Sequence, residues 1–306
     1  MRCEMMRRKK CLGVLVTAVL LISGVFASGA LAGMTVRESA DGRFTFKENE
    51  RPVLTYNFRD QPVPAGVTGI YAVPRGDYVH PIYGPDGEEL TLAYSPDHPH
   101  HRGIYWAWPE VTYKGETHDL HALQGVFSRP VKMRRVEDGS DSALIEAENV
   151  WKWDDKEEIV RETVLITVSR AVKKQRVIDF RFTFEALHDE VGLARRGQAQ
   201  YGGFNVRLSP RENLKIITHT DPEGTIPRRA WGEVAGVAPG AKGPVGLTIL
   251  ESLANPGYPG DWVQYEYLPW LQPTFPTAGS VYALQSGRPL TLSYRVVVHS
   301  GELDEK

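Results

Sequence analysis

The chain has 306 residues, and its two cysteines, Cys3 and Cys11, both lie close to the N-terminus. The remaining residues therefore contain no disulfide, no cysteine nucleophile and no thiolate metal site. The formal net charge of −2 argues against a nucleic-acid partner, because such a partner requires a strongly basic face.

Residues 1–32 have the pattern of a secretory signal peptide. A basic segment precedes an apolar run over 11–26, and small residues follow, ending in Ala30-Leu31-Ala32. This order predicts cleavage after Ala32. An uncleaved anchor is the alternative, although the apolar run is shorter than the ~20 residues of a spanning helix. The prediction is an exported protein, periplasmic or extracellular, in which residues 33–306 form one domain without a membrane span.

Alternating apolar and polar residues recur along the chain and predict β-strands. The clearest run is 177–185, where one face is aliphatic or aromatic and the other is polar or charged. Similar runs occur at 52–58, 143–151, 159–168 and 290–296. No segment has apolar residues at helical spacing over three turns, and Gly- and Pro-containing turns separate the strands. The sequence therefore predicts an all-β fold, namely a single-domain antiparallel β-sandwich.

Six of the nine histidines lie within one short part of the chain: His80, His98, His100, His101, His118 and His121. The densest stretch is 95–103, which also contains Asp97 and Arg102. Two prolines and a glycine make a regular strand or helix unexpected there. A polar loop of this kind contributes little to a core, so its composition predicts a functional site.

Two chemistries suit these residues. In the first, His80, His100 or His101 acts as acid and base, and Arg102 polarises an oxygen of the substrate. In the second, His98, His100 and His101 are ligands of a divalent metal ion. The spacing matches no compact metal motif such as H-E-x-x-H, so the cofactor stays open.

Aromatic residues follow the histidine stretch directly. Trp106 and Trp108 share a face in an extended segment, and we predict that they form a wall of the ligand site beside Asp97. Packing in the core is the alternative for such residues. The later segment 253–280 is rich in Pro, Gly and aromatic residues and has no clear period, so it is predicted to be a long ordered loop.

Several of these motifs resemble the secreted bacterial PmoA-like family. The matching segments span residues 45–301, and they are 78–87, 96–103, 106–108, 201–204, 255–259 and 294–299. The resemblance implies an association with carbohydrate catabolism, and the family label implies a methane oxygenase. It also adds Tyr201, Asn255 and Tyr258 to the predicted substrate-binding residues.

The leading prediction is an exported β-sandwich enzyme that acts on a carbohydrate or related polyhydroxylated small molecule by lyase, hydrolase or epimerase chemistry. A non-catalytic carbohydrate-binding module is the first alternative, and it requires the tryptophans but not the histidines. A metal-dependent oxygenase is the second alternative, and it requires bound copper or iron.

Overall fold

The alternating runs form long antiparallel strands in the computed structural model, which describes residues 33–196, 200–218, 228–265 and 268–301. No helix is present in these ranges, so none of them contains a helix that could cross a membrane. The predicted signal peptide lies outside the described residues. Residues 31–306 group as one compact unit, in which two large sheets and two small ones are distinguished.

The first large sheet has nine strands. Their order across the sheet is β1 (Met34–Glu38), β2 (Arg43–Glu48), β3 (Arg51–Asn57), β4 (Tyr78–Ile82), β7 (Ile104–Ala107), β15 (Gly203–Arg207), β21 (Leu268–Pro273), β20 (Gly260–Tyr265) and β17 (Arg228–Arg229). The second large sheet has eight strands, in the order β10 (Val126–Glu137), β11 (Ser142–Trp153), β12 (Glu157–Ser169), β13 (Gln175–Ala186), β23 (Leu290–Ser300), β19 (Val245–Glu251), β18 (Trp231–Val237) and β16 (Glu212–Thr218).

Two small sheets complete the unit. Four strands form one of them, in the order β22 (Val281–Leu284), β14 (Val191–Ala194), β8 (Glu110–Tyr113) and β9 (Glu116–His118). The other is a pair, β5 (Ala93–Ser95) and β6 (His98–Arg102). All the sheets are antiparallel.

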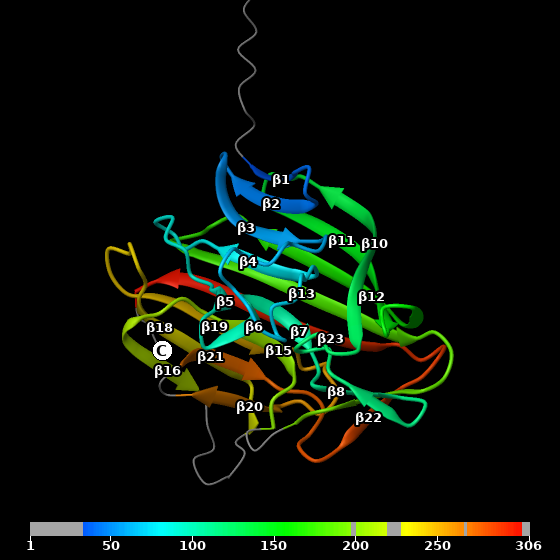
Figure 1. Ribbon diagram of the computed structural model, residues 1–306. Coiled ribbons are helices and arrows are strands. Elements are labelled where there is room, and N and C mark those ends of the chain that lie inside the picture. The colour runs from blue at the N-terminus through cyan, green and yellow to red at the C-terminus, as the bar shows by residue number, and fades with distance from the viewer. Residues whose placement is uncertain (1–32, 197–199, 219–227, 266–267, 302–306) are drawn as a thin grey trace, which may run out of the picture. The chain divides into compact units, whose positions relative to one another are not determined.

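The two large sheets pack face to face around an aromatic core (Figure 1). The Phe182 ring of β13 lies 4.2 Å from the Trp106 ring of β7. On the neighbouring strand β15, Phe204 is the register partner of Trp106, and its ring stacks at 4.6 Å on Tyr294 of β23. Each contact joins one large sheet to the other, so the structure confirms the predicted β-sandwich.

The predicted strands are confirmed where only one face of a strand meets the core. The runs 52–58, 143–151, 159–168, 177–185 and 290–296 fall in or overlap β3, β11, β12, β13 and β23. In β11, β12, β13 and β23 buried and less buried positions alternate, as the apolar pattern requires, whereas the last five residues of β3 are all buried.

Two predictions of irregular structure are wrong. The segment 253–280 contains β20 and β21, and every residue of β21 is buried. A strand buried on both faces has no alternating pattern, so its sequence did not show it. The histidine stretch contains β6, which pairs with β5; Pro99 is tolerated because both strands of a two-stranded sheet are edges.

Candidate functional site

The site begins on the outer face of the nine-stranded sheet, on strands β7, β15 and β21. Tyr105 and Asn205 are register partners on neighbouring strands. Because side chains alternate along a strand, both point away from the core that contains Trp106 and Phe204. Gln272 of β21 donates a hydrogen bond to the Asn205 side-chain oxygen, which extends this polar row across three strands.

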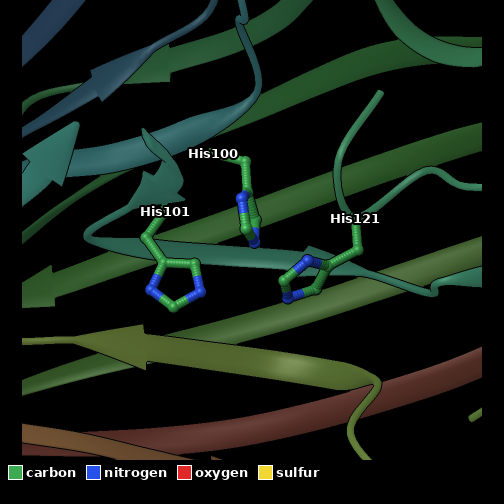
Figure 2. Close-up of side chains that lie close together, drawn as sticks. All are labelled: His100, His101 and His121. Carbon is green, nitrogen blue, oxygen red and sulfur yellow. The ribbon is translucent and has the colours of Figure 1, made fainter. Parts of the chain in front are cut away.

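Three histidines gather above this row. His100 and His101 come from β6, and His121 comes from the turn after β9. The ring centroid of His100 lies 4.7 Å from that of His101 and 5.1 Å from that of His121. One nitrogen of each ring can be chosen so that all three nitrogens lie within 4.8 Å of one another (Figure 2). We call these three residues the histidine cluster.

The backbone of His121 is fixed by residues far away in the sequence. Its amide donates to the Trp108 carbonyl at 3.2 Å, and Arg75 donates to its carbonyl at 2.9 Å. The ring is also held, because Nε2 lies 2.9 Å from the Tyr105 hydroxyl and 3.1 Å from the Asn205 side-chain oxygen. His121 therefore reaches the cluster through tertiary contacts and not through a local motif.

The other two rings have unused nitrogens. Nδ1 of His100 and Nδ1 of His101 are buried, and neither has a hydrogen-bond partner in the described part of the chain. Nearly all buried polar atoms in folded proteins are hydrogen-bonded, so an exception calls for an explanation such as an ion or a ligand. Two such atoms on adjacent residues make the cluster a candidate binding site.

Burial keeps the cluster uncharged. It lowers the pKa of His100 to about 3, with further contributions from the charges of His98 and Arg75. Burial is also the main reason why the pKa values of His101 and His121 lie well below the usual histidine value. At neutral pH the rings are therefore neutral, whereas a general acid or base works best with a pKa near the working pH.

Arg102 supports the β5–β6 pair instead of facing a ligand. Its guanidinium donates to the carbonyls of Pro99, His101 and Val73, and it lies 3.3 Å above the centre of the Tyr94 ring. Its side chain is almost completely buried. These contacts fix the backbone that carries His100 and His101, and the role of Arg102 toward a substrate stays a prediction.

Asp97 and His98 form the outer edge of the cluster. Asp97 accepts two hydrogen bonds from Arg207 of β15, at 2.9 and 3.0 Å, and lies 3.0 Å from Nδ1 of His98. The His98 ring stacks at 4.6 Å on His101. In the predicted ligand trio, His98 is thus replaced by His121, while Asp97 anchors the β5–β6 pair to the large sheet.

His80 lies apart from the cluster. Its Nδ1 is 2.9 Å from the Thr91 hydroxyl and its Nε2 is 3.6 Å from a carboxylate oxygen of Glu89. Burial, with the charge of Arg102, lowers its pKa to about 4. Among the ring contacts of the described residues, none joins His80 to another histidine, so the structure does not bring it into the predicted acid–base set.

The prediction that Trp106 and Trp108 form a ligand wall is wrong. Both side chains are buried between the large sheets, where Trp106 donates to Glu162 and Trp108 donates to the Phe275 carbonyl at 2.7 Å. The two residues do share a face, as expected, but that face is the core. Tyr105, which directly precedes Trp106 in the sequence, is the residue that points to the site.

The structure treats the three remaining candidates differently. Tyr201 lies beside the cluster, with its ring centroid 5.1 Å from that of His121. Asn255 instead exchanges two hydrogen bonds with the backbone of Ser293 in β23, and the Tyr258 amide donates to the Asn255 carbonyl. Asn255 and Tyr258 thus shape a turn on the eight-stranded sheet and do not contact the cluster.

A polar pocket of about 690 Å³ lies next to the cluster. Its lining residues carry hydroxyl, imidazole, carboxylate, amide and guanidinium groups as well as one exposed aromatic ring: Ile70, Tyr71, Thr117, His118, Asp119, Gln124, Gly125 and Arg196. Tyr71 connects the two features, because its ring lies 5.2 Å from His100. We call this hollow the polar pocket.

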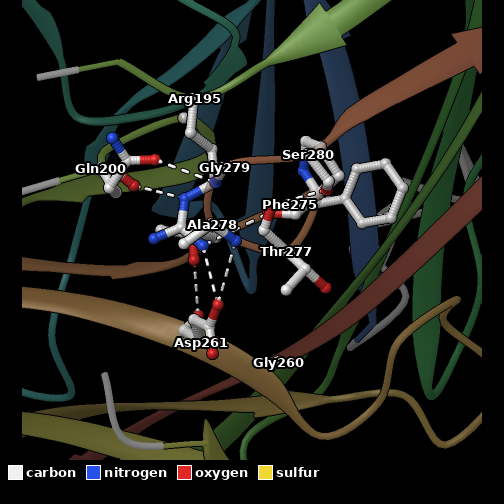
Figure 3. Close-up of polar contacts among 12 residues, drawn as sticks. Arg195, Gln200, Gly260, Asp261, Phe275, Thr277, Ala278, Gly279 and Ser280 are labelled. Atoms are coloured by element: carbon white, nitrogen blue, oxygen red, sulfur yellow. Dashed lines mark hydrogen bonds and ion pairs between the residues drawn. The ribbon is translucent and has the colours of Figure 1, made fainter. Parts of the chain in front are cut away.

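A buried ion pair holds one wall of the polar pocket in place (Figure 3). Arg195 and Asp261 are 2.9 Å apart, and both are almost fully buried. Arg195 also donates to the carbonyls of Gln200 and Pro276. The pair therefore ties the segment with Arg196 and Tyr201 to β20.

Comparison with known proteins gives a family but no activity. Residues 43–306 match a family of unknown function, DUF6807. The chain belongs to this DUF6807 family. No protein in a search of curated proteins matches the chain. The resemblance to the PmoA-like family stays a prediction.

In this DUF6807 chain, the histidine cluster fits a divalent transition metal. Zinc, copper, iron and nickel accept imidazole nitrogens, and catalytic zinc sites commonly use three protein ligands. Bonds of about 2.1 Å in tetrahedral geometry place the donor atoms about 3.4 Å apart. The nitrogens lie within 4.8 Å, so small side-chain rotations close the site. Tyr105 and Asn205 already orient the third ring.

Proposed function

We propose that this protein is an exported enzyme that holds a divalent transition-metal ion on His100, His101 and His121 and acts on a polyhydroxylated ligand such as a carbohydrate. One observation carries the proposal: three imidazole nitrogens lie within 4.8 Å of one another beside a polar pocket. A bound metal of this kind polarises a ligand oxygen or activates a water molecule.

The polar pocket supports the choice of ligand class. Tyr71 is 42% exposed, and its flat ring offers a stacking surface for the apolar face of a sugar. Asp119, Gln124 and Arg196 supply acceptors and donors for hydroxyl groups on the same hollow. A concave site with convergent polar groups and one aromatic wall is typical of small polar ligands.

Two of the hypotheses from the sequence receive less support, namely the binding module and the leading hypothesis of acid–base chemistry by free histidines. A binding module was expected to use Trp106 and Trp108, which are part of the core. Acid–base chemistry by free histidines was expected to use His80, which lies apart, and Arg102, which holds backbone carbonyls. A metal-dependent oxygenase stays compatible with the cluster and differs from other metal enzymes in requiring copper or iron.

Elemental analysis tests the metal. The full chain is incubated separately with Zn²⁺, Cu²⁺, Fe²⁺ and Ni²⁺, desalted and analysed. We expect one tightly bound ion per chain for at least one of these metals. The double variant His100→Ala/His101→Ala should lose this ion and keep its circular dichroism spectrum, and His80→Ala is the matched control that should retain it. Substoichiometric binding of every metal by the wild-type chain would overturn the proposal.

An activity screen follows on the loaded protein. A panel of sugars and sugar derivatives is incubated with the metal-loaded chain, the metal-free chain and the double variant, and products are separated by chromatography. We expect turnover only in the loaded wild-type sample. Equal turnover in all three samples would show that catalysis does not use the cluster.

A further inference from the structure

The surroundings of the histidine cluster are rich in buried positive charge. Arg75, Arg102 and Arg207 are each at most 4% exposed, and all three influence the cluster electrostatically. Arg207 is paired with Asp97, whereas within the described ranges no carboxylate forms an ion pair with Arg75 or Arg102. Buried arginines are normally paired directly, whereas Asp77, Glu162 and Asp119 act on Arg75 without forming an ion pair among the described residues.

The two arginines without an ion pair both keep an unpartnered Nε, but they differ in their other contacts. Arg102 donates to three carbonyls and lies on the Tyr94 ring. Arg75 donates to one carbonyl, that of His121, and its guanidinium carbon lies 4.8 Å from the centre of the Tyr105 ring. Its Nε is buried and has no hydrogen-bond partner among the described residues. Arg75 therefore retains unused capacity to donate hydrogen bonds.

That capacity lies beside the histidine cluster. Arg75, His100 and His121 line one narrow crevice, and Tyr71 lines both this crevice and the polar pocket. A ligand in the polar pocket therefore reaches Arg75 by passing the Tyr71 ring, which must turn aside. With Tyr71 in place the crevice has no room even for a water molecule, so a ligand group occupies only the space that the turning ring opens.

We propose that the ligand is a sugar acid whose carboxylate binds Arg75 between His100 and His121, while its hydroxyl groups occupy the polar pocket. The inference rests on the proposed function, because it assigns the substrate class of the same site. A guanidinium binds a carboxylate through two parallel hydrogen bonds, and a carboxylate supplies the negative charge that the buried arginines lack.

Calorimetric titration compares acids with their neutral counterparts. The probes are D-glucuronate and D-galacturonate, with D-glucose and D-galactose as neutral partners and inorganic phosphate as a non-sugar anion. We expect at least one uronate to bind the wild-type chain about 10- to 100-fold more tightly than its neutral partner, the range that charge-assisted hydrogen bonds give. Equal affinity within both sugar pairs would overturn the inference. Phosphate binding as tight as the uronates would overturn the carboxylate assignment.

Variants assign the preference to one residue. Arg75→Gln should remove it, and Arg75→Lys should keep only part of it, because lysine has a charge but no planar fork. Arg211→Gln is the matched control, since Arg211 also donates to a buried carbonyl, that of Leu90, but does not line the site. An unchanged preference in Arg75→Gln would refute the role of Arg75. If this variant does not fold, the wild-type comparison still decides the substrate class.

Metal content separates this inference from the proposed function. A wild-type chain that binds no metal but prefers uronates through Arg75 would refute the metal enzyme and retain the sugar-acid site. A chain that binds one metal per molecule but shows no preference for acids would retain the metal site and refute the sugar-acid assignment.

Discussion

Two regions of this molecule bury polar side chains, and they differ in whether the buried atoms have partners. Inside the sandwich, both carboxylate oxygens of Glu162 accept an indole N–H, one from Trp106 and one from Trp151. In the histidine cluster on the outer face, the Nδ1 atoms of His100 and His101 have no partner among the described residues. The two oxygens of Glu162 are therefore satisfied, whereas the histidine cluster leaves positions that a ligand can fill.

The same contrast extends to the neighbouring groups. Beside Glu162, the buried Asp77 carboxylate accepts hydrogen bonds at 2.8 Å from Tyr56, Ser128 and Asn149. Beside the cluster, Arg75 keeps an unpartnered Nε. Burial alone therefore does not identify a functional site. The unmet hydrogen bonds on the adjacent residues His100 and His101, whose rings lie together, are what singles out the cluster as a candidate site.

The largest effect on stability is expected at Glu162. Glu162→Ala removes the acceptor of two buried indole N–H groups, and we expect it to lower the free energy of unfolding by about 3–5 kcal/mol. Urea denaturation followed by tryptophan fluorescence measures this loss. Glu185→Ala is the control, because Glu185 pairs with Arg161 near the surface and should cost less than about 1 kcal/mol. If Glu162→Ala also lost less than about 1 kcal/mol, the contrast between Glu162 and the histidine cluster would be contradicted.

Metal binding should make the histidine cluster contribute to the free energy of unfolding. Without metal, His100→Ala should cost about 1 kcal/mol or less, because the Nδ1 that it removes makes no hydrogen bond. With free metal at about 100 times its dissociation constant, the wild-type chain should gain about 2.7 kcal/mol and the variant should gain nothing. Urea curves with and without the metal give both numbers. An equal gain in the variant would place the ion elsewhere.

The strands and the histidine stretch could be predicted from the sequence, because both are local patterns. The alternation in 177–185 identifies β13, and the imidazoles around His100 stand out from their neighbours. The face that meets the core could not be predicted. Alternation separates Trp106 from Tyr105, but it does not say which of the two faces the second sheet.

The remaining site residues are brought together by long-range contacts. His121 was visible as one of six clustered histidines, yet its place depends on the Trp108 carbonyl and on Asn205. Arg75 belongs to no motif, and only its burial and its missing partner identify it. Such residues carry no sequence signal of their own, because their role is set by how distant strands pack.

A smaller effect tests the contact that links the sheet to the cluster. Tyr105→Phe removes the hydroxyl 2.9 Å from Nε2 of His121 and keeps the ring, so we expect a stability loss of about 1 kcal/mol. Metal affinity should fall by about 10- to 100-fold, because the hydroxyl orients a metal ligand. Competition with a chromogenic chelator measures the affinity. Tyr113→Phe is the matched control: its hydroxyl donates to Glu157 near the surface, so its loss should leave metal affinity unchanged. Equal metal affinities in the two variants would mean that Tyr105 packs beside the cluster without positioning His121. The outer face of β7 would then support the site by packing alone.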